Sequence, residues 1–267
     1  MVQTLIKRAP EIVPYIGYLI ADEAHHAPAL QFADTIKQFD CKYLSGLTAT
    51  PFRRDNLSKV IFFHLGDVVG TVDKAELDKN GALCECLVKQ IATNFKSEVS
   101  FQDYYSKALS EMCKDMERNK LIADIVALDS CSGIKLILSD RVQHLNDLAS
   151  LLADKGILAG VLTGAAKTQD RLQLLSNLKA GKLKFLLATF QLISEGFDMP
   201  DIESIYLTTP IKFSGRVIQA VGRALRPALG KDKALVYDFV DINEPVLSLQ
   251  ADSRVKTYER QGFEICF

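Results

Sequence analysis

Two carboxylates follow directly behind a short apolar run near the start of the chain. The run occupies residues 18–21, and Asp22 and Glu23 come next, followed by Ala24 and His25. A strand buried on both faces of a parallel sheet reads as a continuous apolar run, and the ligands of such sheets gather outside the carboxyl ends of the strands. One carboxylate there could hold Mg²⁺ while the other orients a water molecule. The alternative is ordinary solvated charge at a helix N-terminus, which the helix dipole favours.

Two arginines in the last quarter of the chain have a spacing suited to phosphate binding. Arg223 and Arg226 lie three residues apart, so a helix would place both side chains on one face. Together they could bind the same phosphate group. The alternative is a solvated basic face of a helix.

Four motifs occur in order along the chain. They are DEAH at 22–25, LTATP at 47–51, AT at 188–189 with SEGFD at 194–198, and QAVGRALRP at 219–227. They resemble motifs II, III, V and VI of the superfamily 2 helicases and translocases, and the resemblance covers nearly the whole chain. Because TATP continues into FRRD at 52–55, the chain is most similar to the branch that holds type III restriction subunits, excision-repair translocases and UvsW-type phage helicases.

This resemblance implies a nucleotide site that uses ATP and Mg²⁺. Asp22 would bind Mg²⁺ through water, Glu23 would activate the attacking water, and His25 would link this site to motif III. Thr48 and Thr50 would couple the two domains. Their alternative role is to satisfy backbone groups in a turn, which is common for threonine.

The later motifs imply further contacts with the nucleotide. Arg226 would act as the arginine finger on the γ-phosphate, with Arg223 beside it and Gln219 one helical turn earlier. Asp198, which follows Gly196, would meet the ribose or the finger arginines. An arginine finger of this kind raises the rate by about 10³-fold or more.

Small hydroxyl groups and exposed amides after three expected strands suit a sugar-phosphate backbone and do not distinguish bases. The candidates there are Ser139, Arg141, Thr163, Gly164 and Thr189, and Arg53 and Arg54 could add phosphate contacts. The alternative for each hydroxyl is a helix cap, where serine and threonine are common. The resemblance implies nucleic acid as the partner, with DNA expected more than RNA.

Short apolar stretches alternate with amphipathic ones through most of the chain, which predicts βαβ units and parallel sheets. The expected strands lie at 18–21, 43–47, 135–138, 159–162, 185–188, 205–207 and 234–240, with a further strand-like stretch at 82–88. With the resemblance, this pattern predicts an α/β protein with two RecA-like domains. We expect a partial first domain over 1–93, a helical segment over 94–132, and a second domain over 133–267 that folds by itself.

The phosphate-binding pattern G-x-x-x-x-G-K-[ST] does not occur in the sequence. A RecA-like domain should carry that loop before Asp22, so we expect the first domain to be truncated at its N-terminus. Without the amides and lysine of the loop, the phosphates lose their main cradle, and we expect the isolated chain to hydrolyse ATP negligibly. Another chain could supply the missing segment. The rival hypothesis is a non-catalytic remnant that binds nucleic acid or a partner protein.

The composition is that of an ordinary globular protein, with 267 residues and 48% hydrophobic content. A net charge of −1 argues against nucleic-acid binding by bulk charge, so any such contact must be local. The six cysteines show no zinc-ligand spacing. No apolar run approaches the roughly 20 residues that span a bilayer. We therefore expect a cytoplasmic protein with no membrane partner.

Overall fold

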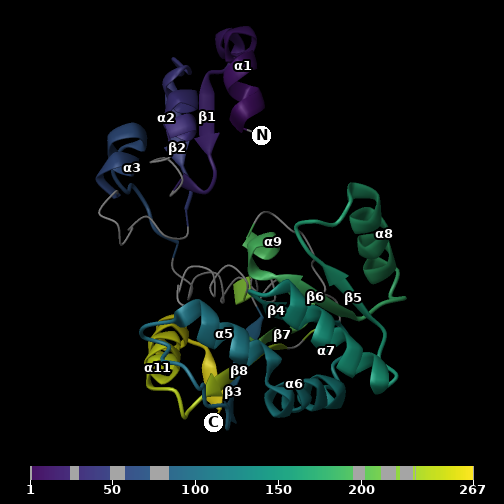
Figure 1. The fold of residues 1–267 in the computed structure, drawn as a ribbon. Helices are drawn as coiled ribbons and strands as arrows, with labels where there is room; N and C mark the ends of the chain where they lie inside the picture. The colour runs from purple at the N-terminus through teal and green to yellow at the C-terminus, as the bar shows by residue number, and fades with distance from the viewer. Residues whose placement is uncertain are drawn as a thin grey trace. The chain divides into compact units, whose positions relative to one another are not determined.

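The structure, a computed structural model, describes residues 2–24, 30–48, 58–72, 84–194, 202–211, 221–222, 231 and 233–266. The chain divides into two compact units, residues 1–72 and 73–267 (Figure 1). The structure thus moves the boundary between the two parts to 72/73 from 93/94, where the sequence pattern predicted it. The reason is that residues 85–93 form a strand of the second unit's sheet.

The first unit contains two short parallel strands with helices on either side in the sequence. Its elements are α1 (Val2–Ile12), the 3₁₀ turn η1 (Val13–Tyr15), β1 (Tyr18–Ala21), α2 (Leu30–Lys37), β2 (Tyr43–Gly46) and α3 (Ser58–Leu65). β1 pairs with β2 in parallel, with Tyr18 opposite Tyr43. Two backbone hydrogen bonds continue past the strands: Leu47 N–H donates to Ala21 O at 2.8 Å, and Ala24 N–H donates to Leu47 O at 2.9 Å. They hold the two following segments side by side.

The second unit is built on a larger parallel sheet. Its described strands are β3 (Glu85–Thr93), β4 (Ile134–Ser139), β5 (Ala159–Leu162), β6 (Phe185–Thr189), β7 (Ile202–Leu207), β8 (Lys233–Asp241) and β9 (Glu264–Cys266). Within the described residues they form one seven-stranded sheet, in the order β5-β6-β4-β7-β8-β3-β9. All the pairings between these strands are parallel. The predicted α/β class is therefore confirmed.

Helices cover both faces of this sheet (Figure 1). The described helices of this unit are α5 (Tyr105–Lys114), α6 (Met116–Leu128), α7 (Val142–Asp154), α8 (Thr168–Lys179), α9 (Phe190–Ser194) and α11 (Pro245–Arg260). On one face, Ile122 of α6 and Leu145 of α7 pack with Ile137 of β4. On the other face, Leu178 of α8 and Tyr258 of α11 belong to a separate core. All six residues of β4 are buried, as expected for a central parallel strand.

Candidate functional sites

The predicted acidic pair lies at the carboxyl end of β1. Asp22 is exposed, and its Oδ1 accepts a hydrogen bond from Glu23 N–H at 2.8 Å. Glu23 has a φ of +51°, and it is the only non-glycine residue with positive φ in the described part of the chain. This left-handed conformation costs about 1–2 kcal/mol for a residue with a side chain, and such conformations cluster at active sites. The backbone therefore singles out the residue that the motif assigns to water activation.

Thr48 follows β2 and lies at the same edge of the first sheet. The hydrogen bond from Ala24 to Leu47 joins its segment to the one that carries Asp22. Close packing supports this arrangement: a Cβ added to Gly46 would lie 2.8 Å from a methyl carbon of Leu65 and 3.0 Å from the Cβ of Ala24. A side chain at this position would therefore crowd Ala24 and α3. Asp22, Glu23 and Thr48 thus lie at the same edge of the two-stranded sheet.

The second unit carries the predicted nucleic-acid positions at the carboxyl ends of three adjacent strands. Thr163 and Gly164 follow β5, Thr189 ends β6, and the segment around Arg141 follows β4. Neighbouring strands lie about 4.8 Å apart, so the three strand ends span about 10 Å. Gly164 is exposed, and a Cβ added there would meet no atom within 4 Å. This edge therefore leaves room for a ligand to approach the backbone.

Ser139 differs from its neighbours because the structure buries it completely. Its Oγ lies 3.0 Å from His144 Nδ1 and accepts a hydrogen bond from Arg141 N–H at 3.1 Å. This corrects the expectation that the Ser139 hydroxyl contacts nucleic acid, because the hydroxyl is used inside the protein. Arg141 is partly exposed, and its Nη2 donates to Ser106 Oγ at 2.8 Å. Arg141 thus remains the charged candidate at this strand end.

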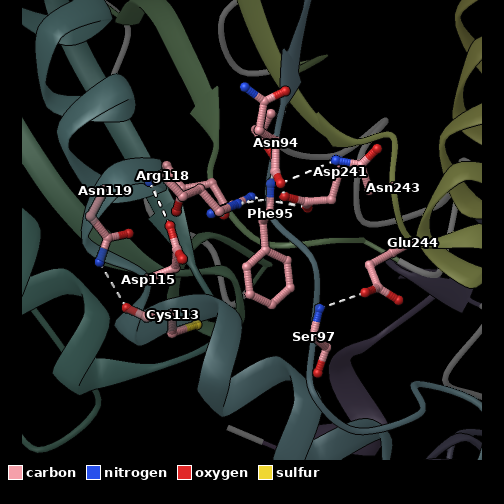
Figure 2. Close-up of polar contacts among 12 residues, drawn as sticks. Asn94, Phe95, Ser97, Cys113, Asp115, Arg118, Asn119, Asp241, Asn243 and Glu244 are labelled. Atoms are coloured by element: carbon pink, nitrogen blue, oxygen red, sulfur yellow. Dashed lines mark hydrogen bonds and ion pairs between the residues drawn. The ribbon is translucent and has the colours of Figure 1, made fainter.

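A buried ion pair lies behind this edge of the sheet, and the sequence pattern did not predict it (Figure 2). Arg118 Nε donates to Asp241 Oδ1 at 2.7 Å, and Nη2 donates to Oδ2 at 3.2 Å. Arg118 Nη1 also donates to Thr208 O at 2.8 Å, and Thr93 Oγ1 donates to Asp241 Oδ1 at 2.5 Å. Both charged side chains are only 1% exposed. One arginine of α6 thus joins the ends of β3, β7 and β8.

The segment after β3 is fixed by a second set of polar contacts (Figure 2). Asn243 Nδ2 donates to Asn94 O at 3.1 Å, and Ser97 N–H donates to Glu244 Oε1 at 2.5 Å. Ser97 Oγ donates to Glu111 Oε2 at 2.7 Å. These bonds tie residues 94–97 to the loop after β8 and to α5. The segment predicted as a helical connection is therefore an integral part of the second unit.

The remaining predicted site residues lie outside the described residues and stay predictions. They are His25, Thr50, Arg53, Arg54, Gly196, Asp198, Gln219, Arg223 and Arg226. In the described part of the chain, no group of three or more histidine, cysteine or acidic side chains could hold a metal ion. No helix in that part is long and apolar enough to cross a membrane.

Two family models match this chain. The model of the helicase conserved C-terminal domain matches residues 117–228, which include the strand ends around Arg141, Thr163 and Thr189. The model of the type III restriction enzyme res subunit matches residues 2–53, which include Asp22 and Glu23. These matches support a superfamily 2 helicase core. Both parts of the predicted resemblance, the motor core and the restriction-enzyme branch, are therefore confirmed.

Proteins similar to this chain include viral helicases and a restriction-enzyme subunit. A protein assigned as helicase 22 of Sulfolobus islandicus filamentous virus is 28% identical over 249 residues, covering 88% of this chain and 44% of the relative. Phage T4 UvsW has a solved structure with a TM-score of 0.55 at 20% identity, covering 99% of this chain and 56% of that one. A fragment assigned as an HsdR subunit of a type I restriction enzyme from Vibrio vulnificus YJ016 has a TM-score of 0.72 at 16% identity, covering 98% and 50%.

The structural matches establish the fold, which is that of RecA-like helicase domains. The chain spans about half the length of the curated relatives it matches. The two family models together include all the predicted strand-end residues described above.

Proposed function

We propose that this chain forms part of an ATP-dependent motor that moves along nucleic acid, with DNA as the favoured substrate. The observation that carries the proposal is the placement of motif residues at strand ends in both units. Asp22 and Glu23 stand at the carboxyl end of β1, while Thr163 and Thr189 stand at the ends of two adjacent strands of the second sheet. Parallel sheets bind their ligands at this edge.

The residues of the first unit fit a site for ATP and Mg²⁺. Magnesium in such sites is held by one or two carboxylates together with waters and substrate phosphates, so an exposed carboxylate at a strand end is suitable. Asp22 would supply that ligand and Glu23 would position the attacking water. Arg226 would stabilise charge on the γ-phosphate, with Arg223 beside it. When bound, Mg²⁺ would neutralise charge that develops on the transferring phosphate.

The residues of the second unit fit a track for the sugar-phosphate backbone. Thr163 and Thr189 offer hydroxyls, Gly164 offers open backbone, and Arg141 offers a positive charge. None of these groups distinguishes one base from another, so the track would bind nucleic acid by its backbone. The net charge of −1 is consistent with contacts to nucleic acid that are confined to a few residues.

A second candidate function is a non-catalytic binding module derived from a helicase. It is favoured by one observation: the printed sequence contains no G-x-x-x-x-G-K-[ST]. That loop supplies backbone amides and a lysine to the phosphates, which the other motifs do not replace.

Comparing the chain alone with a chain completed by a phosphate-binding segment distinguishes the motor from the binding module. Phosphate release should be negligible for the chain alone, and it should appear when a segment carrying the phosphate-binding loop is joined upstream or co-expressed. In the completed protein, turnover should rise with single-stranded DNA and should be abolished by Glu23→Gln. Arg226→Ala should lower it by about 10³-fold.

Other outcomes would change the assignment. A completed protein that binds ATP and DNA but never turns over would favour the binding module. Robust turnover by the chain alone, lost in Glu23→Gln, would show that another element of this chain binds the triphosphate. Stimulation by RNA and not by DNA would reverse the expected substrate.

A further inference from the structure

A chain of buried hydrogen bonds lies under the loop that carries Arg141. We propose that His144, held by Asn119, is a positioning residue that fixes the backbone at Arg141 for contact with the nucleic-acid backbone. The inference rests on the proposed function, because it requires Arg141 to contact nucleic acid. It assigns a role to two polar residues of α6 and α7 that no motif includes.

The donors and acceptors around His144 define which nitrogen of its ring carries the proton. Asn119 Nδ2 donates to Cys113 O at 2.8 Å, so its Oδ1 is the acceptor that lies 2.9 Å from His144 Nε2. The ring proton is therefore on Nε2, and Nδ1 accepts from the Ser139 hydroxyl at 3.0 Å. The Ser139 oxygen then accepts from Arg141 N–H at 3.1 Å.

Burial makes this series of bonds obligatory. Ser139, His144 and Asn119 are exposed by 0%, 1% and 2%, so water cannot replace a lost partner. Burial, with a smaller contribution from the charge of Arg118, lowers the pKa of His144 to about 3. The ring therefore stays neutral near pH 7, and Nδ1 stays an acceptor for Ser139. A positively charged ring would donate from both nitrogens and would break the bond to Ser139.

Three bonds converge on the loop that follows β4. Ser139 Oγ holds Arg141 N–H, Thr209 Oγ1 accepts from Asp140 N–H at 3.0 Å, and Ser106 Oγ accepts from Arg141 Nη2 at 2.8 Å. The Nε of Arg141 is buried and has no hydrogen-bond partner among the described residues. Arg141 as a whole is partly exposed, and its charge at the end of β4 suits a phosphate oxygen. Its position depends on the backbone that Ser139 and His144 hold.

The test measures binding of a fluorescently labelled single-stranded oligonucleotide by anisotropy, using the full chain. Arg141→Ala should weaken binding by about tenfold, the value of one charge-assisted hydrogen bond. His144→Phe keeps an aromatic ring but removes both nitrogens, and it should weaken binding by a similar factor. The double variant should be no weaker than either single variant, because both act through one contact.

Two further variants separate positioning from general destabilisation. His144→Asn should restore most of the binding, because its amide oxygen can occupy the place of ring Nδ1 and accept from Ser139. Ile122→Val, in the same core as α7 but without a polar contact, should lower stability and leave binding unchanged. Ser139→Ala removes the last two bonds of the series, the one to His144 Nδ1 and the one from Arg141 N–H, and should behave like His144→Phe.

A spectroscopic measurement on the unaltered protein needs no variant to fold. The ¹⁵N shifts of His144 should report a neutral ring with the proton on Nε2, both at pH 7 and at about pH 5. A proton on Nδ1, or a charged ring at about pH 5, would overturn the proposal directly. The ¹⁵N shifts therefore test the proposal even if the His144→Phe variant does not fold.

The outcomes also separate this inference from the proposed function. If Arg141→Ala binds like the unaltered chain, the nucleic-acid track is wrong at this position. If Arg141→Ala is weak but His144→Phe and Ser139→Ala bind normally, the positioning role is wrong and the track stands. Additive losses in the double variant would likewise show that His144 acts independently of Arg141.

Discussion

The two units of this chain differ in how well their strands are covered. In the first unit, Tyr18, Ile20 and Tyr43 are each more than half exposed on their strands. In the second unit, every residue of β4 is buried and helices pack on both faces of the sheet. Parallel strands are normally covered on both faces, so the first sheet has less internal support. The acidic motif therefore stands on the less supported sheet, and the nucleic-acid track stands on the well-packed one.

The largest expected effect concerns where the second unit begins. A protein of residues 84–267 should fold and unfold cooperatively, whereas residues 133–267 should not. The shorter protein lacks β3, which pairs with both β8 and β9, and it lacks Ile122, Ala123 and Val126 of α6. Circular dichroism during urea unfolding would compare the two. A cooperative transition of equal midpoint in residues 133–267 would restore the boundary predicted from the sequence.

Hydrogen exchange of the full chain should show the next largest difference. Amides of Leu136, Leu186 and Val236 should exchange only through global opening of the second unit, because these residues lie in its core. Amides of Leu19 and Leu44 should exchange far faster, through local opening of the two-stranded sheet. Mass spectrometry or NMR would measure the protection. Equal protection in both units would mean that the first sheet gains support from other contacts.

The buried ion pair makes the second unit sensitive to a single charge. Arg118→Ala should lower the free energy of unfolding by about 3–5 kcal/mol, because it leaves Asp241 buried and unpaired. Lys155→Ala provides the matched control, since it removes a partly exposed pair with Asp124. That variant should cost less than about 1 kcal/mol. Urea unfolding of the three proteins gives both numbers, and equal losses would contradict the role assigned to burial.

The smallest of these effects is a pH dependence from His144. The folded pKa is about 3, whereas in the unfolded chain the ring binds a proton below about pH 6.5. Stability is therefore complete above pH 6.5 and is lost as the pH falls toward 3. Between pH 7 and pH 5 the loss from this group is about 2 kcal/mol.

Comparing the unaltered chain with His144→Asn at both pH values isolates that contribution, because the carboxylates titrate in both proteins. The variant should lose about 2 kcal/mol less on acidification. An identical pH dependence in the two proteins would mean that the ring is protonated in the folded state as readily as in the unfolded one.

Much of the fold was predictable because local patterns determine it. The strands at 18–21 and 159–162 match the expected ranges, and most others differ by up to three residues at an end. The exception is β3, which runs to Thr93, whereas the expected stretch ended at residue 88. Apolar runs of this kind are typical of parallel strands. β9 was missed because it has only three residues, too few for a pattern. The placement of β3 beside β8 was not predictable either, because strand order depends on contacts between distant residues.

The candidate sites were predictable only where a motif marks them. Asp22 and Glu23 were found because they follow an apolar run, and the structure places them at the end of that strand. Arg118, His144 and Asp241 were missed because charged and polar residues usually lie at the surface, and burial depends on partners far away in the sequence. Asp115 was the one local signal, since it caps the helix by accepting from Arg118 N–H at 2.7 Å.

The position of β3 in the sheet also has a consequence for synthesis. Its last residue, Thr93, bonds to Asp241, 148 positions later in the chain. At about 5–20 residues per second, a ribosome takes roughly 7–30 s to make that intervening stretch. During that time both edges of β3 lack their strands, since β8 and β9 come later. The nascent chain therefore exposes β3 without either neighbouring strand until β8 and β9 have left the ribosome.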